Sequence, residues 1–82
     1  MTEIQFESCV NNIISIYESN QDIDDFNNEV GVALYTMEIF ISNQDIVSIL
    51  AYIVENYNIG KSAHNILINF MDDYKFSLKY DR

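Results

Sequence analysis

Apolar residues recur at intervals of three or four along most of this chain, the spacing that places side chains on one face of an α-helix. The pattern predicts helices over residues 3–17, 20–41, 43–58 and 63–74. In chain order, the expected core-facing stripes are Phe6, Val10, Ile13 and Tyr17; Ile23, Phe26, Val30, Leu34, Met37 and Ile41; Ile46, Ile49, Leu50, Ile53, Val54 and Tyr57; and Ala63, Ile66, Leu67, Phe70, Met71 and Tyr74.

Polar residues that can cap helices mark the expected helix ends. Thr2, with Gln5 three residues later, has the spacing of a capping box. The pentapeptide Ser-Asn-Gln-Asp-Ile occurs at 19–23 and again at 42–46, and in each copy we expect the serine to cap the next helix and the aspartate to lie in its first turn. Convergent caps and a short internal duplication both account for this repeat. Gly60 is expected to end the third helix.

Residues 30–36 depart from the helical pattern because they are rich in strand-forming types around a central glycine. Both a strand and a helix are compatible with this segment. If it is helical, Val32, Tyr35 and Ile39 lie opposite the core-facing stripe. They would then be buried on a second side or exposed as a binding patch.

Residues 74–81 form a second exception, since apolar and polar side chains alternate there as in a half-buried strand. Such a strand would pair with residues 30–36 or with a strand of another protein.

Taken over the whole chain, the helical spacing predicts a mainly α fold, a compact bundle of about four helices. Residues 75–82 are expected to form an extended tail or a short C-terminal β-strand.

The composition indicates a small, strongly acidic globular protein. The chain has 82 residues, enough for a single domain spanning 1–82, and 49% of them are hydrophobic, which disfavours disorder. The net charge of −9 is uneven: residues 1–60 hold ten acids and no lysine or arginine, whereas residues 61–82 hold three acids and four basic residues. Such a surface repels phosphate backbones and anionic membranes, so we expect a basic protein partner, with no nucleic acid and no membrane as direct partners.

The lack of a predicted membrane span, of a secretory signal and of a pair of cysteines favours a cytoplasmic location. No stretch approaches the ~20 apolar residues of a membrane span, and the first residues lack the basic and apolar segments of a secretory signal. Cys9 is the single cysteine and cannot form an internal disulfide. The oligomeric state stays open.

One segment resembles the end of a phosphate-binding loop but lacks the residues that its chemistry needs. Gly60-Lys61-Ser62 leads into a predicted helix, yet Glu55 stands where the first glycine of that loop belongs. A carboxylate there would repel phosphate. A helix stop at the glycine and a cap at Ser62 account for the segment.

Candidate metal and catalytic residues are equally incomplete. The acids at 22, 24 and 25 are spaced like the start of a calcium-binding loop, but Phe26 and Asn27 stand where an oxygen ligand and a glycine belong. His64 has no cysteine or acid three or four residues away, and Cys9 has no evident base. We therefore expect a protein that is not an enzyme, with no catalytic residue, metal or cofactor.

An acidic cluster offers a better candidate for a functional site. Within twelve residues that contain no base, the chain carries five acids, which we call the acidic cluster: Glu18, Asp22, Asp24, Asp25 and Glu29. On a helix, the acids at 22, 25 and 29 would line one face. A one-signed surface steers association with a basic protein, and Tyr17, Tyr35 and Tyr52 are candidate anchors for the contact.

In its size, charge and helical layout, the whole chain resembles the small acidic bacterial immunity proteins that neutralise nuclease toxins of the colicin and contact-dependent growth inhibition systems. The resemblance implies a compact cytoplasmic antitoxin that occludes the basic surface of a nuclease. Phage-encoded acidic inhibitors and DNA mimics, of the anti-restriction or anti-CRISPR type, share this profile and form the first alternative. A small helical adaptor that acts by strand addition through its C-terminal segment is the second.

Overall fold

The computed structural model of the protein describes residues 1–19 and 22–80, with side chains up to residue 78. It contains four helices, α1 (Glu3–Ser19), α2 (Ile23–Met37), α3 (Asn43–Asn56) and α4 (Lys61–Tyr80). Nothing in these two ranges is in a strand, and the predicted mainly α fold of four helices is confirmed.

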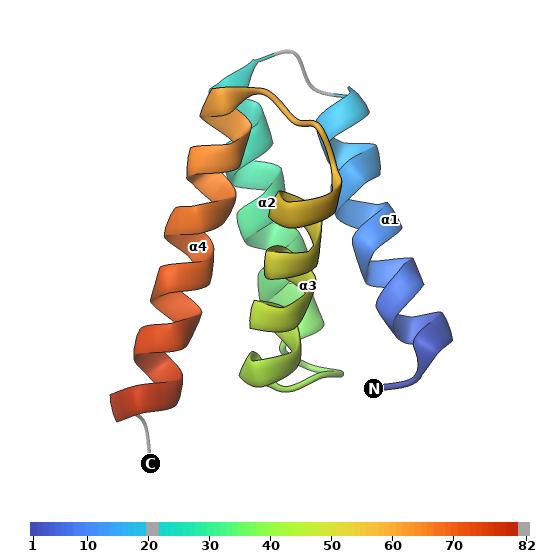
Figure 1. Ribbon diagram of the computed structural model, residues 1–82, viewed down its shortest axis with the longest axis vertical. Helices are drawn as coiled ribbons and strands as arrows, with labels where there is room; N and C mark the ends of the chain where they lie inside the picture. The colour runs from blue at the N-terminus through green and yellow to red at the C-terminus, as the bar shows by residue number, and fades with distance from the viewer. Residues whose placement is uncertain (20–21, 81–82) are drawn as a thin grey trace.

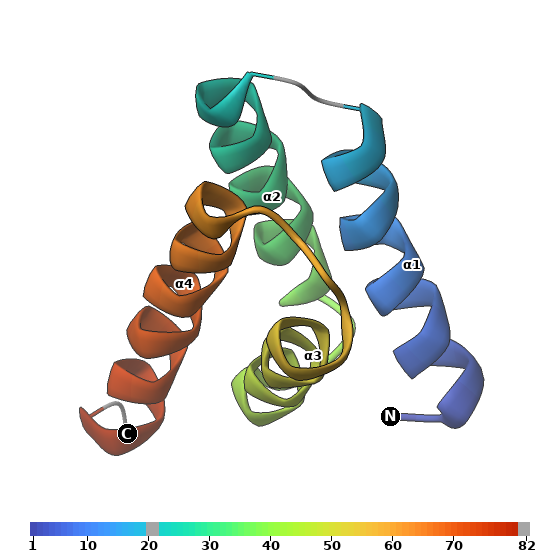
Figure 2. The ribbon, with the colours of Figure 1, turned by 45° about the horizontal axis from the view of Figure 1, so that its top comes forward.

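The helices are arranged so that α1 and α4 lie on opposite sides of the molecule, with α2 and α3 between them (Figure 1). The most extensive packing is between α3 and α4, and α1 packs on both α2 and α3. In Figure 2, α3 is seen nearly end-on while the other three helices are seen from the side, so α3 crosses them steeply. The start of α1 and the end of α4 lie at one end of the molecule, and α2 begins at the other (Figure 1).

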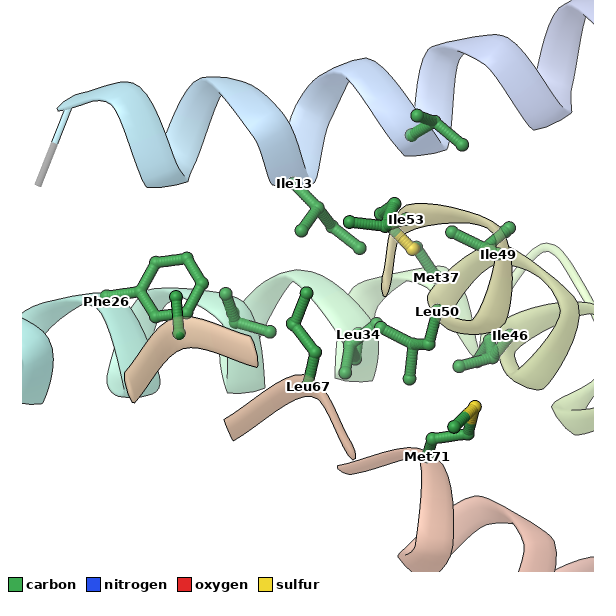
Figure 3. Packing of buried hydrophobic residues seen from close by; sticks show 13 residues of the cluster. Ile13, Phe26, Leu34, Met37, Ile46, Ile49, Leu50, Ile53, Leu67 and Met71 are labelled. Atoms are coloured by element: carbon green, nitrogen blue, oxygen red, sulfur yellow. The ribbon is translucent and has the colours of Figure 1, made fainter. Parts of the chain in front are cut away.

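In the part of the chain that the structure describes, the core consists of thirteen buried apolar side chains contributed by all four helices. Figure 3 shows how Ile13 of α1 points toward Ile53 of α3, while Leu67 of α4 approaches Leu34 of α2. Every buried residue belongs to a stripe predicted from the sequence: Val10, Ile13, Phe26, Val30, Leu34, Met37, Ile46, Ile49, Leu50, Ile53, Ala63, Leu67 and Met71. The helical spacing therefore identified the core-facing side of each helix. Two residues predicted to face the core are exposed instead: Ile23 at 40% in the first turn of α2 and Tyr57 at 37% after the last turn of α3.

Two of the predicted caps are confirmed by hydrogen bonds. At the start of α1, the Thr2 hydroxyl accepts from the Gln5 amide N–H (3.1 Å), and the Gln5 side chain accepts from the Thr2 N–H (2.9 Å). At the start of α3, the Ser42 hydroxyl accepts from the Asp45 N–H (3.1 Å). Each bond satisfies a donor that the helix itself leaves without an acceptor.

The predicted cap of α2 is wrong, because Ser19 is the last residue of α1. Asp22 is the N-cap instead, and its carboxylate accepts from the Asp24 N–H (2.8 Å). The two copies of the repeated pentapeptide thus start their helices differently, with the aspartate as the cap in one and the serine in the other. Residues 20 and 21, where the second helix was predicted to begin, lie outside the described residues.

The prediction that Gly60 ends the third helix and the prediction that Ser62 caps the fourth helix are both wrong. Helix α3 ends at Asn56, and Gly60 precedes α4, where its carbonyl accepts from the His64 N–H (2.9 Å) and so begins the helix. Ser62 lies inside the first turn of α4. No glycine in the described residues has a positive φ, so neither one acts as a left-handed helix stop.

The predicted extended tail over residues 75–82 is wrong as far as residue 80, because α4 continues to Tyr80; residues 81 and 82 lie outside the described part. Leu67, Met71, Tyr74 and Leu78 are spaced by four, three and four residues, so one helical stripe runs on through the alternating segment. The Tyr74 hydroxyl donates to the Glu38 carboxylate (2.6 Å), which attaches this part of α4 to the turn after α2.

Residues 30–36, for which the sequence allowed a strand or a helix, are helical. A C-terminal strand would therefore have had no partner strand in this segment. Val30 and Leu34 are fully buried, and the burial of this stripe outweighs the strand propensity of its neighbours. The Thr36 hydroxyl donates back to the Val32 carbonyl (3.0 Å), as threonine often does within a helix. Helix α2 ends at Met37 rather than at the predicted residue 41, and a tight turn follows it.

Candidate protein-binding surface

The acidic cluster gathers where α1 ends and α2 begins, at the top of Figure 1. All five of its side chains are exposed: Glu18 near the end of α1, Asp22 at the N-cap of α2, and Asp24, Asp25 and Glu29 along the first two turns of α2. None of these carboxylates has a basic nitrogen within 4 Å among the side chains described. Their charges therefore face solvent without an ion-pair partner among these side chains.

The start of α2 explains why unpaired carboxylates are tolerated there. Free amide N–H groups and the helix dipole give a helix N-terminus partial positive charge, and a nearby carboxylate gains about 0.3–1 kcal/mol from it. Asp24 and Asp25 lie in this first turn, and Asp22 binds the Asp24 N–H directly. Asp22 consequently serves the helix as well as the surface charge, and it lies at the cap of α2 rather than within the helix that carries Asp25 and Glu29.

The acids form a spread rim rather than a chelating site. Glu18 and Asp22 line a groove of about 550 Å³ together with Lys61 at the start of α4. Glu29 lines a separate hollow of about 400 Å³ between α1 and α2. Among the described residues, no three His, Cys, Asp or Glu side chains lie close enough together to hold a metal ion.

The outward side of α2 continues from the acids into an apolar stripe. Val32, Tyr35 and Ile39 are 68%, 72% and 73% exposed, so this side of α2 forms an exposed patch rather than a second buried side. Together with Asp25 and Asn28 they are spaced by three, four, three and four residues, which places all five on one side of the helix and of the turn that follows it. We call these five residues the outer face of α2.

Phe40 extends this apolar region and was not identified from the sequence. It is 74% exposed in the turn between α2 and α3. The sequence signal was its position beside Ile39 and two residues before the Ser42 cap, where the chain passes from one helix to the next.

Tyr17 has a structural role that the sequence did not reveal. Its hydroxyl accepts from the Gly60 N–H (2.9 Å), and its half-buried ring meets the Phe26 ring edge-on with centroids 5.8 Å apart. Tyr17 therefore joins the end of α1 to the segment before α4. Within residues 1–19 and 22–78, Tyr35 has no such hydrogen bond or ring contact, and its exposed ring on the outer face of α2 is available to a partner.

Cys9 and His64 do not form a catalytic arrangement. Cys9 is half-buried on α1, and burial raises the pKa of its thiol, which disfavours the nucleophilic thiolate. His64 is half-buried near the start of α4. The structure gives neither residue a base or an acid that would activate it within the described part.

Comparison with known proteins identified no match: neither a protein-family model, nor a curated protein, nor a solved structure is significantly similar to the chain. In addition, none of the helices in the described residues has the length and apolar character needed to cross a membrane. The function must therefore be argued from the surface itself.

Proposed function

We propose that the protein is a cytoplasmic immunity protein, which binds a cognate bacterial nuclease toxin and neutralises it by occluding its basic active-site or nucleic-acid-binding surface. The observation that carries the proposal is the outer face of α2, where Asp25, exposed like the rest of the acidic cluster, lies on the same side as exposed Val32, Tyr35 and Ile39. A nuclease presents lysine and arginine side chains to bind phosphates, and these are the groups that carboxylates pair with.

The acidic cluster and the apolar residues of the outer face of α2 would contribute differently to binding. Carboxylates at the start of α2 steer the encounter, so they act mainly on the association rate. Tyr35 and its apolar neighbours lose water in the complex, so they act mainly on the dissociation rate. From Asp25 to Ile39 the face is about 21 Å long at 1.5 Å per residue, which is comparable with the ~30 Å width of a typical 800 Å² contact patch.

The strand-addition adaptor loses the feature on which it depended, because residues 74–80 are helical. A phage-encoded inhibitor would use the same surface against a different basic enzyme. The genes beside this one separate the two origins, since an adjacent nuclease toxin gene indicates immunity.

The test measures binding kinetics with that neighbouring nuclease at several salt concentrations. The association rate should fall steeply as ionic strength rises, and the variant Asp24→Asn/Asp25→Asn/Glu29→Gln should associate at least tenfold more slowly with little change in dissociation. A matched control removes three charges elsewhere, Glu55→Gln/Asp72→Asn/Asp73→Asn, and should change the rate much less. Equal effects of the two variants, or a rate insensitive to salt, would contradict the electrostatic part of the proposal.

A further inference from the structure

A second groove lies between the first half of α1 and α3, away from the acidic cluster. It has a volume of about 370 Å³ and is lined by three aromatic rings and two carboxylates, with Val10 and Asn11 completing the wall: Phe6, Tyr52, Tyr57, Glu3 and Glu7. Glu7 precedes Glu18 by eleven residues on α1, which corresponds to about 16 Å along the helix axis. We call this site the aromatic groove.

The three rings are set at steep angles to one another. The centroids of Phe6 and Tyr52 are 5.1 Å apart with their planes at 80°, and those of Tyr52 and Tyr57 are 6.3 Å apart at 65°. In such edge-to-face pairs, the edge of one ring covers one face of its neighbour, and the opposite face of that neighbour is not covered by the pair. Tyr52 and Tyr57 keep 42% and 37% of their surface exposed.

Hydrogen-bonding groups at the groove are also unused. Neither tyrosine hydroxyl has a hydrogen-bond partner among the described residues, and the carboxylates of Glu3 and Glu7 have no ion pair there. Glu3 and Glu7 are four residues apart and so lie on the same side of α1. The capping box between Thr2 and Gln5 fixes the first turn that carries Glu3. The groove thus combines π-faces, two negative charges and free acceptors.

We propose that the aromatic groove binds the guanidinium group of an arginine side chain carried by a partner protein. A guanidinium is planar and weakly hydrated, stacks on aromatic faces, and donates several N–H bonds that match carboxylate and hydroxyl oxygens. A lysine ammonium is more strongly hydrated and does not stack, and a quaternary ammonium donates no hydrogen bond. Arginine is the cation that matches the aromatic rings, the tyrosine hydroxyls and the carboxylates of the groove together. This match holds whichever partner carries the arginine, so the inference does not rest on the proposed function.

The experiment is an NMR titration of the full chain with N-acetyl-arginine methylamide, a single arginine side chain without charged ends. We expect saturable shifts of the Phe6, Tyr52 and Tyr57 ring protons. The neutral isostere N-acetyl-citrulline methylamide should bind at least tenfold more weakly, as should tetramethylammonium. The absence of saturable shifts, or binding of either control compound as tight as that of the arginine compound, would overturn the assignment.

Variants at exposed positions locate the site without disturbing the core. Glu3→Gln/Glu7→Gln should weaken binding of the arginine compound at least tenfold, whereas Asp24→Asn/Asp25→Asn removes the same charge from the acidic cluster and should leave it unchanged. The reverse result would place binding at the acidic cluster and refute the groove. The acetylated and amidated peptide Gly-Gly-Arg-Gly-Gly should bind at least as tightly as the single residue; weaker binding would show that an arginine within a protein chain does not fit.

Discussion

Leu34 and Tyr35 are adjacent in the sequence but lie on opposite sides of α2, and they provide a direct test of how this helix is oriented. Leu34 is fully buried, whereas Tyr35 is 72% exposed. Truncation of a buried leucine to alanine removes its apolar contacts and leaves a cavity, which costs about 2–5 kcal/mol. A native domain of 82 residues is stabilised by about 4–12 kcal/mol, so Leu34→Ala should remove a large part of the free energy of unfolding.

Tyr35→Ala should have almost no effect on the same quantity. The exposed ring contributes little packing, and alanine has a helix propensity about 0.5 kcal/mol better than that of tyrosine. Urea denaturation followed by circular dichroism gives both free energies, and an unchanged slope with urea shows that the two-state comparison is valid. A loss above about 2 kcal/mol for Tyr35→Ala, or below about 1 kcal/mol for Leu34→Ala, would mean that α2 is rotated and that its outer face is not a free surface.

Three further predictions concern individual contacts. Gly31→Ala should raise the free energy of unfolding by about 0.5–1 kcal/mol, because alanine favours a helix over glycine by this amount. The added Cβ fits, since it would lie 3.5 Å from the Phe70 ring, an ordinary contact; a decrease in Tm would contradict this prediction. Ser42→Ala should lower it by about 1 kcal/mol in urea denaturation through loss of the α3 cap, and no change would mean that the cap is dispensable. Burial, followed by the bond and charge of Glu38, raises the pKa of Tyr74. In an alkaline absorbance titration, Tyr74 should therefore lose its proton at a higher pH than an ordinary tyrosine does. The variant Glu38→Gln should lower this pKa, because it removes the carboxylate charge beside the hydroxyl. Because the folded pKa of Tyr74 exceeds the unfolded one, its contribution to stability is complete below pH about 10 and falls as the pH rises above it.

The parts of the fold that were predictable from the sequence depend on neighbouring residues. In the caps at Thr2 and at Ser42, the donor residue follows the acceptor residue by three positions. The buried stripes likewise follow from the spacing of residues within single helices. The segment from residue 74 was misassigned because its alternation is compatible with a strand, while the same residues also extend the stripe of α4. A strand there has no partner strand in the described residues, whereas the helix gains the bond between Tyr74 and Glu38.

The candidate sites also combine features that neighbouring residues determine with features that depend on the folded backbone. The charge of the acidic cluster could be predicted, since its residues are close in the sequence, but the cap formed by Asp22 depends on the backbone before α2. The aromatic groove could not be predicted, because Phe6 and Tyr52 are 46 residues apart and helical spacing does not determine which helices meet. The exposure of Tyr35 also required the structure, since both outcomes fitted the pattern of residues 30–36.

The most direct test of the central claim is inhibition of a nuclease toxin whose gene is found beside the gene for this protein. Titrated against the nuclease with its nucleic-acid substrate at physiological salt, the protein should abolish cleavage near one molar equivalent. The variant Asp24→Asn/Asp25→Asn/Glu29→Gln combined with Tyr35→Ala should need at least a hundredfold more protein, while Glu55→Gln/Asp72→Asn/Asp73→Asn should inhibit almost as well as the natural protein. Full cleavage in the presence of excess protein, or inhibition unaffected by the first set of substitutions, would contradict the proposal that the outer face of α2 and its acids neutralise a nuclease toxin.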